Sequence, residues 1–407
     1  MTALPGLRAG RDALRRCAAV PPGEFADRVW GRAPLLSPGV SDFSDLLTLA
    51  DVDELLSRRG LRTPFIRMAR DGAVVGSAQF TGGGGVGAEV GDQVRDDKVA
   101  ALFAAGSTVV LQGLHRMWPP LIDFARDLVA DLGHPVQVNA YITPPSSQGF
   151  SAHYDVHDVF VLQVAGRKRW SVHEPVHRDP LRSQPWDRRK DAVARRAREE
   201  PALEATLSPG DALYLPRGYL HSARALGEVS AHLTVGVHVL TRYAVAEALL
   251  ALAGESEELR ASLPLGVDAA DGAQLGVEDT VAALVRALRG VDPDDVARVV
   301  RDRVWSGTRP APLAPLAQAA AAGTADVGTA VEPRAGLRHR TGVDGDRAWL
   351  EVPGDRLDLP ASTAPALAAL LAGRCVVGDL PGLPAEDQVV LVRRLLREGV
   401  LRPADPA

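Results

Sequence analysis

Cysteine is scarce in this chain of 407 residues, since only Cys17 and Cys375 are present. They lie far apart and neither belongs to a Cys-x-x-Cys pair, which excludes a disulfide framework and a cysteine-rich zinc site as the basis of the fold. The simplest interpretation is two structural thiols in a reducing compartment, and it predicts a cytoplasmic protein.

Long apolar runs and excess positive charge are also missing. The stretch that comes nearest to a membrane span, residues 244–254, is short and contains Glu247, so we predict no membrane span. The first twenty residues carry charges throughout and lack an apolar core followed by a cleavage site, so we predict no signal peptide. The net charge of −5 argues against nucleic acid as the default partner.

What remains is an ordinary globular composition, with 46% hydrophobic and 24% charged residues. The length predicts two or three folded units. Between residues 25 and 243 short β-type runs alternate with Gly- and Pro-rich turns, as in VQVNAYITPP, DVFVLQVAGRKRWSVH and SAHLTVGVHV. This pattern predicts a mainly β domain over residues 1–243, built as an antiparallel barrel or double-sheet jelly roll.

The pattern changes after residue 243. Apolar residues recur at helical spacing over residues 244–306, which predicts a small α-helical unit. An Ala-, Pro- and Gly-rich stretch at 307–330 has few large side chains and is typical of a linker. Residues 331–407 combine β-like pieces with two helical patterns, in the order of a winged-helix-like α+β module.

The segment SAHYDVHD contains the residues best suited to hold a metal ion. His153 and Asp155 are two apart, so on an extended chain both side chains leave the same face. His221 ends a later segment, PGDALYLPRGYLH, which reads as a turn followed by a strand over residues 212–215. Two imidazoles and one carboxylate on one face of a metal leave positions open for oxygen and a co-substrate, as in non-haem Fe(II) oxygenases. An isolated His-x-Asp is common by chance, and the β-rich context gives this one its weight.

Lys168 follows the turn that ends the VFVLQV strand, so a hairpin returns it towards His153 and Asp155. A buried cation near an iron centre would suit the distal carboxylate of a dicarboxylate such as 2-oxoglutarate. Its neighbours Arg167 and Arg169 face the opposite way and are predicted to be solvated. The side on which Lys168 leaves the strand does not by itself distinguish a functional lysine from a lysine on the protein surface.

Taken together, the run NAYITPPSSQGFSAHYDVHDVFVLQVAGRKRWSVHEP, followed by LSPGDALYLPRGYLHSA and AHLTVGV, resembles the JmjC-type ribosomal oxygenases, a branch of the cupin superfamily. The resemblance implies a JmjC double-stranded β-helix, a helical dimerisation unit that forms a homodimer, and a C-terminal winged-helix-like module. It also implies that His153, Asp155 and His221 bind Fe(II) and that Lys168 pairs with the C5 carboxylate of 2-oxoglutarate.

Further pocket residues are implied by the same resemblance. Asn139 and Tyr141 alternate on the preceding strand and would line the co-substrate pocket, or else form an ordinary strand pair with one buried amide. The sequence departs from the family at Gly236, where a Ser or Thr commonly also contacts the co-substrate carboxylate. Thr234 shares its facing and is the candidate substitute.

The leading hypothesis is therefore a 2-oxoglutarate-dependent dioxygenase that hydroxylates an amino-acid side chain of a protein or peptide, such as a ribosomal protein. A tailoring hydroxylase of a ribosomally made peptide or natural product would share every catalytic residue. A non-enzymatic cupin module that binds or scaffolds would have no use for the intact triad. A metal-dependent isomerase or a dioxygenase that works without 2-oxoglutarate would have no use for Lys168.

Overall fold

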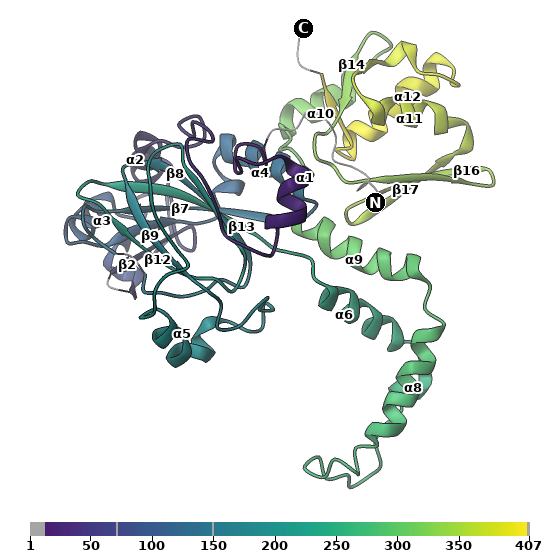
Figure 1. Cartoon of the computed structure of the whole chain (residues 1–407). Coiled ribbons are helices and arrows are strands. Elements are labelled where there is room, and N and C mark those ends of the chain that lie inside the picture. The colour runs from purple at the N-terminus through teal and green to yellow at the C-terminus, as the bar shows by residue number, and fades with distance from the viewer. Residues whose placement is uncertain (1–12, 71, 149, 405–407) are drawn as a thin grey trace. The chain divides into compact units, whose positions relative to one another are not determined.

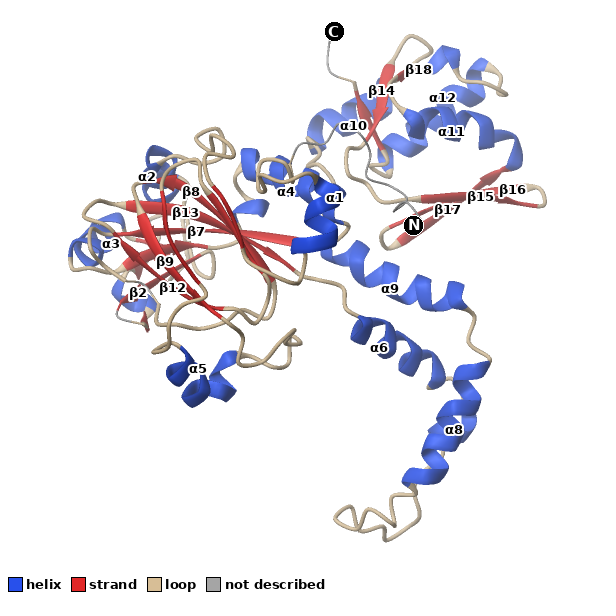
Figure 2. Ribbon diagram, in the orientation of Figure 1, coloured by secondary structure: helices blue, strands red, loops and turns tan. Residues whose placement is uncertain are grey.

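Two units divide the chain between Val239 and Leu240. The computed structural model describes residues 13–70, 72–148 and 150–404. Figure 1 follows the chain by colour, and Figure 2 shows that long strands gather in the first unit whereas helices open the second. Within the described ranges, no helix is long and apolar enough to cross a membrane.

The first unit contains a large antiparallel sheet. Its strands follow the order β1 (Leu35–Ser37), β11 (Ala212–Leu215), β8 (Asp158–Ala165), β13 (Ser230–Val237), β7 (Val136–Thr143), β6 (Thr108–Leu111), β2 (Ile66–Arg70) and β3 (Ala73–Val75). Neighbours far apart in sequence, such as β13 between β7 and β8, are typical of a rolled sheet. The prediction of short antiparallel strands is confirmed, and β11 has the bounds that the sequence predicted.

A second antiparallel sheet joins β10 (Leu203–Leu207), β9 (Lys168–His173) and β12 (Leu220–Ala225). The short pair β4 (Thr81–Gly82) and β5 (Gln93–Val94) completes the strands described in this unit. Its helices are α1 (Pro22–Glu24), α2 (Leu49–Arg58), α3 (Asp96–Ala104), α4 (Pro119–Leu132) and α5 (Lys190–Arg196).

Local sequence signals set two of these helices. Helix α2 begins at a capping box in which Thr48 and Asp51 bond each other's backbone N–H. Helix α4 begins at two prolines and ends at Gly133, whose φ of +74° suits glycine. Residues Leu121 and Leu128 of α4 pack into the hydrophobic core on one face of the large sheet.

Strand β7 shows how the sheet separates a core from a cavity. Residues 136, 138, 140 and 142 are apolar, buried and part of the main hydrophobic core. The alternate residues, including Tyr141 and Thr143, leave the other face of the sheet. Farther along that other face, Val159 and Val161 of β8 pack with Trp170 of β9 in a second apolar cluster. The functional side chains lie on this inner face.

The second unit begins with four helices: α6 (Arg242–Ala253), α7 (Glu257–Arg260), α8 (Val277–Arg289) and α9 (Pro293–Gly307). Helix α6 starts at Thr241, whose side chain caps the N–H of Ala244, and α9 starts at Asp292, which caps Asp294. Their apolar spacing predicted these helices.

The rest of the second unit surrounds its own hydrophobic core. It comprises α10 (Pro315–Thr324), β14 (Ala330–Pro333), β15 (Arg340–Asp344), β16 (Arg347–Val352), β17 (Asp355–Pro360), α11 (Ala364–Ala372), β18 (Cys375–Val376), α12 (Ala385–Arg397) and β19 (Leu401–Pro403). One prediction needs correction, because helix α10 lies inside the stretch expected to be a linker, residues 307–330. Alanine favours helix, Ala322 is buried in the core, and the Gln318 side chain donates to the carbonyls of Leu396 and Leu401.

Candidate metal centre and co-substrate pocket

The three predicted metal ligands come together through a short backbone bridge. His153 lies before β8 rather than on a regular strand, and it pairs with His221 of β12. The N–H of His221 donates to the carbonyl of His153 at 2.8 Å, and the reverse bond is 3.2 Å. Between the two ligands of this segment, Tyr154 is buried in a separate apolar cluster. The expectation that His153 and Asp155 share one side therefore holds without a regular strand.

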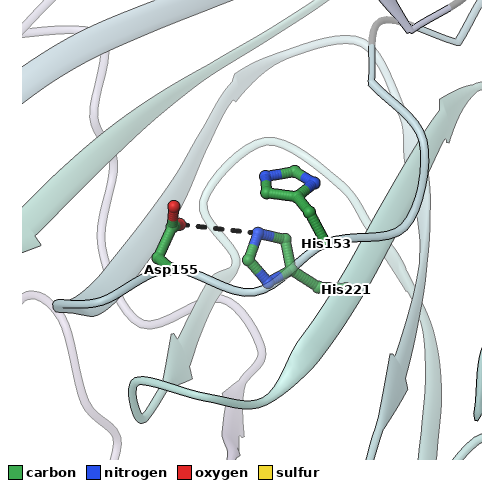
Figure 3. A group of neighbouring side chains, drawn as sticks. All are labelled: His153, Asp155 and His221. Carbon is green, nitrogen blue, oxygen red and sulfur yellow. Dashed lines mark ion pairs between the residues drawn. The ribbon is translucent and has the colours of Figure 1, made fainter. Parts of the chain in front are cut away.

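The ligand atoms of these three residues converge. One ligand atom of each lies within 4.8 Å of the others, and Nε2 of His221 is 3.6 Å from Oδ2 of Asp155. Figure 3 shows both rings and the carboxylate turned towards a common space. Two nitrogens and one oxygen in this arrangement match the facial set used by non-haem iron sites.

The hydrogen bonds of the two rings prepare them to bind a metal. Nδ1 of His153 lies 2.8 Å from the carbonyl of Ser151, and Nδ1 of His221 lies 3.2 Å from the carbonyl of Tyr219. Because a carbonyl only accepts, each Nδ1 carries the proton and each Nε2 presents a lone pair. The residues present therefore fit a divalent cation.

Charge at this centre is consistent with that assignment. Burial, reinforced by the charge of His153, lowers the pKa of His221 to about 4, so its ring is neutral at physiological pH. Burial alone would raise the pKa of Asp155, but the nearby histidines, His157 first, outweigh it and hold this pKa below the ordinary value. A neutral His221 ring beside an ionised Asp155 carboxylate is the protonation state that metal binding requires.

A cavity of about 440 Å³ opens from the three ligands. Its described lining residues are Arg67, Gly72, Val74, Thr108, Tyr141, Thr143, Phe150, Ser151, His153, Asp155, Val159, Val161, Lys168, Trp170, Trp186, His221, Ser222, Ala223, His232 and Thr234. The lining combines aromatic and aliphatic side chains with many polar and charged groups, which suits a polar small molecule.

Lys168 is a buried cation in this cavity, with 4% of its surface exposed. Its Nζ donates to Oγ1 of Thr143 at 2.9 Å and lies 3.3 Å from Nδ1 of His232. No carboxylate of the described residues forms an ion pair with it. Burial lowers the pKa of Lys168 to about 7. Since an uncompensated buried charge is costly, the site is suited to receive an anion.

The neighbours of Lys168 behave as predicted. Arg167 and Arg169 are exposed and pair with Glu228 and Glu204 at the surface. The side chain of His232 is buried and lines the cavity. Burial, and then the charge of Lys168, lowers its pKa well below the ordinary value, so the neutral ring can accept from the lysine.

Of the other predicted pocket residues, Tyr141 and Thr234 are among the described lining residues of the cavity and Asn139 is not. The Tyr141 ring stacks on His232 with centroids 5.1 Å apart. Oδ1 of Asn139 accepts a hydrogen bond from the N–H of Gly113. This contact agrees with the alternative of an ordinary strand residue, and the role of Asn139 in the co-substrate pocket stays a prediction.

The departure at Gly236 also has a structural account. A Cβ built at Gly236 would come within 2.9 Å of Cε1 of His157, so no side chain could extend there without a shift. Lys168 receives its polar contacts from Thr143 and His232 instead. Neither residue was predicted from the sequence. Thr143 has the same parity as Tyr141 along β7, whereas His232 reaches the cavity through its pairing with Tyr141 across β7 and β13.

Comparisons with known proteins agree with this architecture. Residues 121–245 match the family model of the JmjC domain. Ribosomal oxygenase 1 of Rattus norvegicus is 31% identical over 261 residues, which cover 61% of this chain and 41% of that protein. The bifunctional lysine-specific demethylase and histidyl-hydroxylase NO66 of Drosophila erecta is 39% identical over 137 residues, covering 32% of this chain and 20% of that protein.

A solved structure extends the likeness of the fold. The ribosomal oxygenase YcfD from Escherichia coli, in complex with cobalt and 2-oxoglutarate, superposes with a TM-score of 0.53 over 95% of this chain and 99% of that chain, at 18% identity. At that identity the likeness concerns the fold. The chain spans about two fifths of the length of the first curated relative it matches. We conclude that residues 121–245 match the JmjC domain family and that the chain is similar to ribosomal oxygenase 1 and to NO66.

Proposed function

We propose that this protein is an Fe(II)- and 2-oxoglutarate-dependent oxygenase that hydroxylates an amino-acid side chain of a protein. The observation that carries the proposal is one cavity holding three convergent metal ligands and a buried lysine without a carboxylate partner among the described residues. The names of the homologues, an oxygenase and a histidyl-hydroxylase, support the reaction class. The YcfD complex with cobalt and 2-oxoglutarate supports the metal and the co-substrate.

In this mechanism His153, Asp155 and His221 would hold the iron, and Lys168 would bind the C5 carboxylate of 2-oxoglutarate. The bound iron and 2-oxoglutarate supply the oxidation of a C–H bond by dioxygen, with succinate and carbon dioxide as co-products. Thr143 and His232 orient the Nζ of Lys168, and both accept from it, so the ammonium keeps a donor for the carboxylate.

The remaining lining residues shape the space for the reaction. Trp170, Val159 and Val161 form an apolar wall. Excluding water strengthens the pairing of Lys168 with its anion. Tyr154 is anchored by its hydroxyl to the carbonyl of Gln184, which steadies the segment carrying His153 and Asp155.

The test is succinate formation by the full chain reconstituted with Fe(II), 2-oxoglutarate and oxygen, without a protein substrate. We expect turnover by the wild type and loss in His153→Ala and Lys168→Ala. Arg169→Ala and His339→Ala are matched controls at exposed positions and should retain turnover. Absence of succinate and of Fe(II) binding in the wild type would contradict the proposal.

The protein target is a narrower part of the proposal. A histidine side chain of a ribosomal protein is the first target to test, because a homologue is named a histidyl-hydroxylase and others ribosomal oxygenases. Incubation with dissociated ribosomal proteins and mass spectrometry would detect a gain of one oxygen atom. If only non-histidine residues gain oxygen, this narrower assignment is wrong while the reaction class stands.

We also propose that residues 244–306 form a dimerisation domain. Exposed apolar residues occur at four-residue spacing on α8, namely Val277, Val281 and Val285, and Tyr243 and Leu250 of α6 are about half exposed. Such a stripe is stabilised when a second copy covers it. Sedimentation should give a dimer for the wild type and a monomer for Val281→Asp, and a wild-type monomer at micromolar concentration would contradict this assignment.

Two further assignments complete the proposal. Residues 331–407, with the helix α10 that packs on them, would form a winged-helix-like domain that contacts protein rather than DNA. The mixed charge of α12 supports protein contact, because Arg394 pairs with Glu398.

A cytoplasmic location fits the two free thiols Cys17 and Cys375. DNA binding at physiological salt would contradict the first assignment, and cell fractionation would test the second.

A further inference from the structure

A second cation, Arg67, reaches the same cavity from a different strand. Arg67 of β2 pairs with Val110, Val110 pairs with Tyr141, and Tyr141 pairs with His232. Directly paired residues of antiparallel strands share a face, so this row places Arg67 on the cavity side. Because neighbouring strands are about 4.8 Å apart, the backbone of Arg67 lies about 14 Å from that of His232, whose ring contacts Lys168. The two cations therefore reach the same cavity from different strands.

The contacts of Arg67 leave part of its guanidinium unused. The group lies 5.3 Å from the ring centre of Phe150 and bonds the hydroxyl of Tyr141. Its Nε is buried and has no hydrogen-bond partner. No carboxylate of the described residues lies within ion-pair distance of Arg67, and Asp155, the one acidic residue among the described lining residues, belongs to the metal centre.

Such an arginine is suited to a ligand that brings its own anion. A guanidinium presents a planar set of N–H donors that binds a carboxylate through two parallel hydrogen bonds. A buried donor without a partner costs free energy that a ligand can recover. The C5 carboxylate of 2-oxoglutarate is assigned to Lys168, and its C1 carboxylate would be held by the metal. A further carboxylate that Arg67 receives would therefore come from the second substrate.

We propose that Arg67 is a specificity-determining residue that binds a carboxylate of the protein substrate, so that the enzyme selects a target residue flanked by Asp or Glu. This inference rests on the proposed function and narrows its substrate class. It also implies discrimination against a cationic side chain in the cavity. With Lys168 paired to 2-oxoglutarate, a lysine or arginine there would meet the fixed cation Arg67 and no carboxylate of the described lining residues outside the metal centre.

Peptide binding tests this inference without requiring the natural substrate. Two pools of nine-residue peptides, one containing Asp and Glu and the other Lys and Arg in otherwise equal random sequence, would be titrated into the full chain loaded with Mn(II) and 2-oxoglutarate without oxygen. The fluorescence of Trp170 and Trp186, which line the cavity, reports binding. We expect the acidic pool to bind about tenfold more tightly, as one charged hydrogen-bonded pair would give.

Variants then assign the preference to one side chain. Arg67→Gln should bind the two pools equally, and Arg67→Glu should prefer the basic pool. Arg70→Gln, at an exposed position of the same strand, should keep the wild-type preference. The inference is overturned if the wild type binds both pools equally, if it binds neither, or if the preference survives in Arg67→Gln.

Succinate formation without peptide separates this inference from the proposed function. If the wild type forms succinate but shows no charge preference, only the role of Arg67 is wrong. If the wild type forms no succinate, the oxygenase assignment fails even where a charge preference exists. A proteome-derived peptide mixture provides a second readout, because peptides that gain one oxygen atom should be enriched in Asp or Glu beside the modified residue.

Discussion

The two faces of strands β7 and β13 carry opposite chemistry although they are made from alternate residues of the same segments. On one face Val138, Ala140, Leu233 and Val235 are at most 1% exposed and pack into the main core. On the other face Tyr141, Thr143, His232 and Thr234 line the cavity. The strand period of two thus separates residues that hold the fold from residues that hold ligands. Substitutions on one face should therefore leave the property of the other face largely unchanged.

The largest expected effect concerns the metal centre. Asp155→Asn keeps the size of the side chain but removes the anionic ligand, so Fe(II) binding and succinate formation should fall to background. The free energy of unfolding of the metal-free protein should change little, because the main core does not include Asp155. Calorimetric Mn(II) titration, the succinate assay and urea unfolding measure the three quantities. Undiminished turnover would show that Asp155 is not a ligand.

On the core face, the expected effect is on stability alone. Leu233 is fully buried, and Leu233→Ala should lower the free energy of unfolding by about 2–5 kcal/mol because it leaves a cavity. The KM for 2-oxoglutarate of the folded protein should remain close to that of the wild type. Urea unfolding and the succinate assay below the unfolding transition make the comparison. A large change in KM at unchanged stability would contradict the separation of the two faces.

How far the sequence predicts this site depends on the same alternation. His153, Asp155 and His221 were predicted because their residue types and spacing occur in a β-rich context, and Lys168 because the family resemblance pairs it with a carboxylate. The structure brings all four to one cavity. Asn139 has the correct parity, but its amide turns to Gly113, and parity alone does not say which backbone group a side chain will reach.

The residues that were not predicted reach the cavity through the pairing of strands that are distant in sequence. Thr143 and His232 approach Lys168 only because β13 lies between β7 and β8, and one chain without an alignment does not reveal that order. Arg67 reaches the cavity through two more strand pairings. In the second unit, α10 escaped prediction because an Ala-, Pro- and Gly-rich composition is compatible with both a linker and a short helix.

Within the cavity, pH should change co-substrate binding through Lys168. Its pKa of about 7 in the free protein means that the ammonium is present below pH 7 and is lost as the pH rises above it. A bound carboxylate favours the ammonium, so binding takes up a proton at higher pH. The KM for 2-oxoglutarate should be nearly constant below pH 7 and should rise by up to about tenfold per pH unit above it. A flat profile from pH 6 to 9 would contradict this role.

The smallest expected effect concerns Thr143, which lies on the cavity face of β7. Thr143→Val keeps the branched shape but removes the hydroxyl that accepts from Lys168 at 2.9 Å. The ammonium then loses a partner, so the pKa of Lys168 should fall further and the affinity for 2-oxoglutarate at pH 7.5 should weaken by several-fold, in line with one charge-assisted bond. Calorimetric titration of the Mn(II)-loaded protein measures it.

A matched variant decides whether the hydroxyl acts through the lysine. Thr234 lines the same cavity, but no hydrogen bond to Lys168 is described for it, so Thr234→Val should leave the pH at which affinity begins to fall unchanged. If Thr143 acts only by holding Nζ, Thr143→Val should have no further effect on affinity in a Lys168→Ala background. A residual effect in that background would mean that Thr143 contacts the co-substrate itself. His232, which lies 3.3 Å from the same Nζ, would then be the residue that orients Lys168.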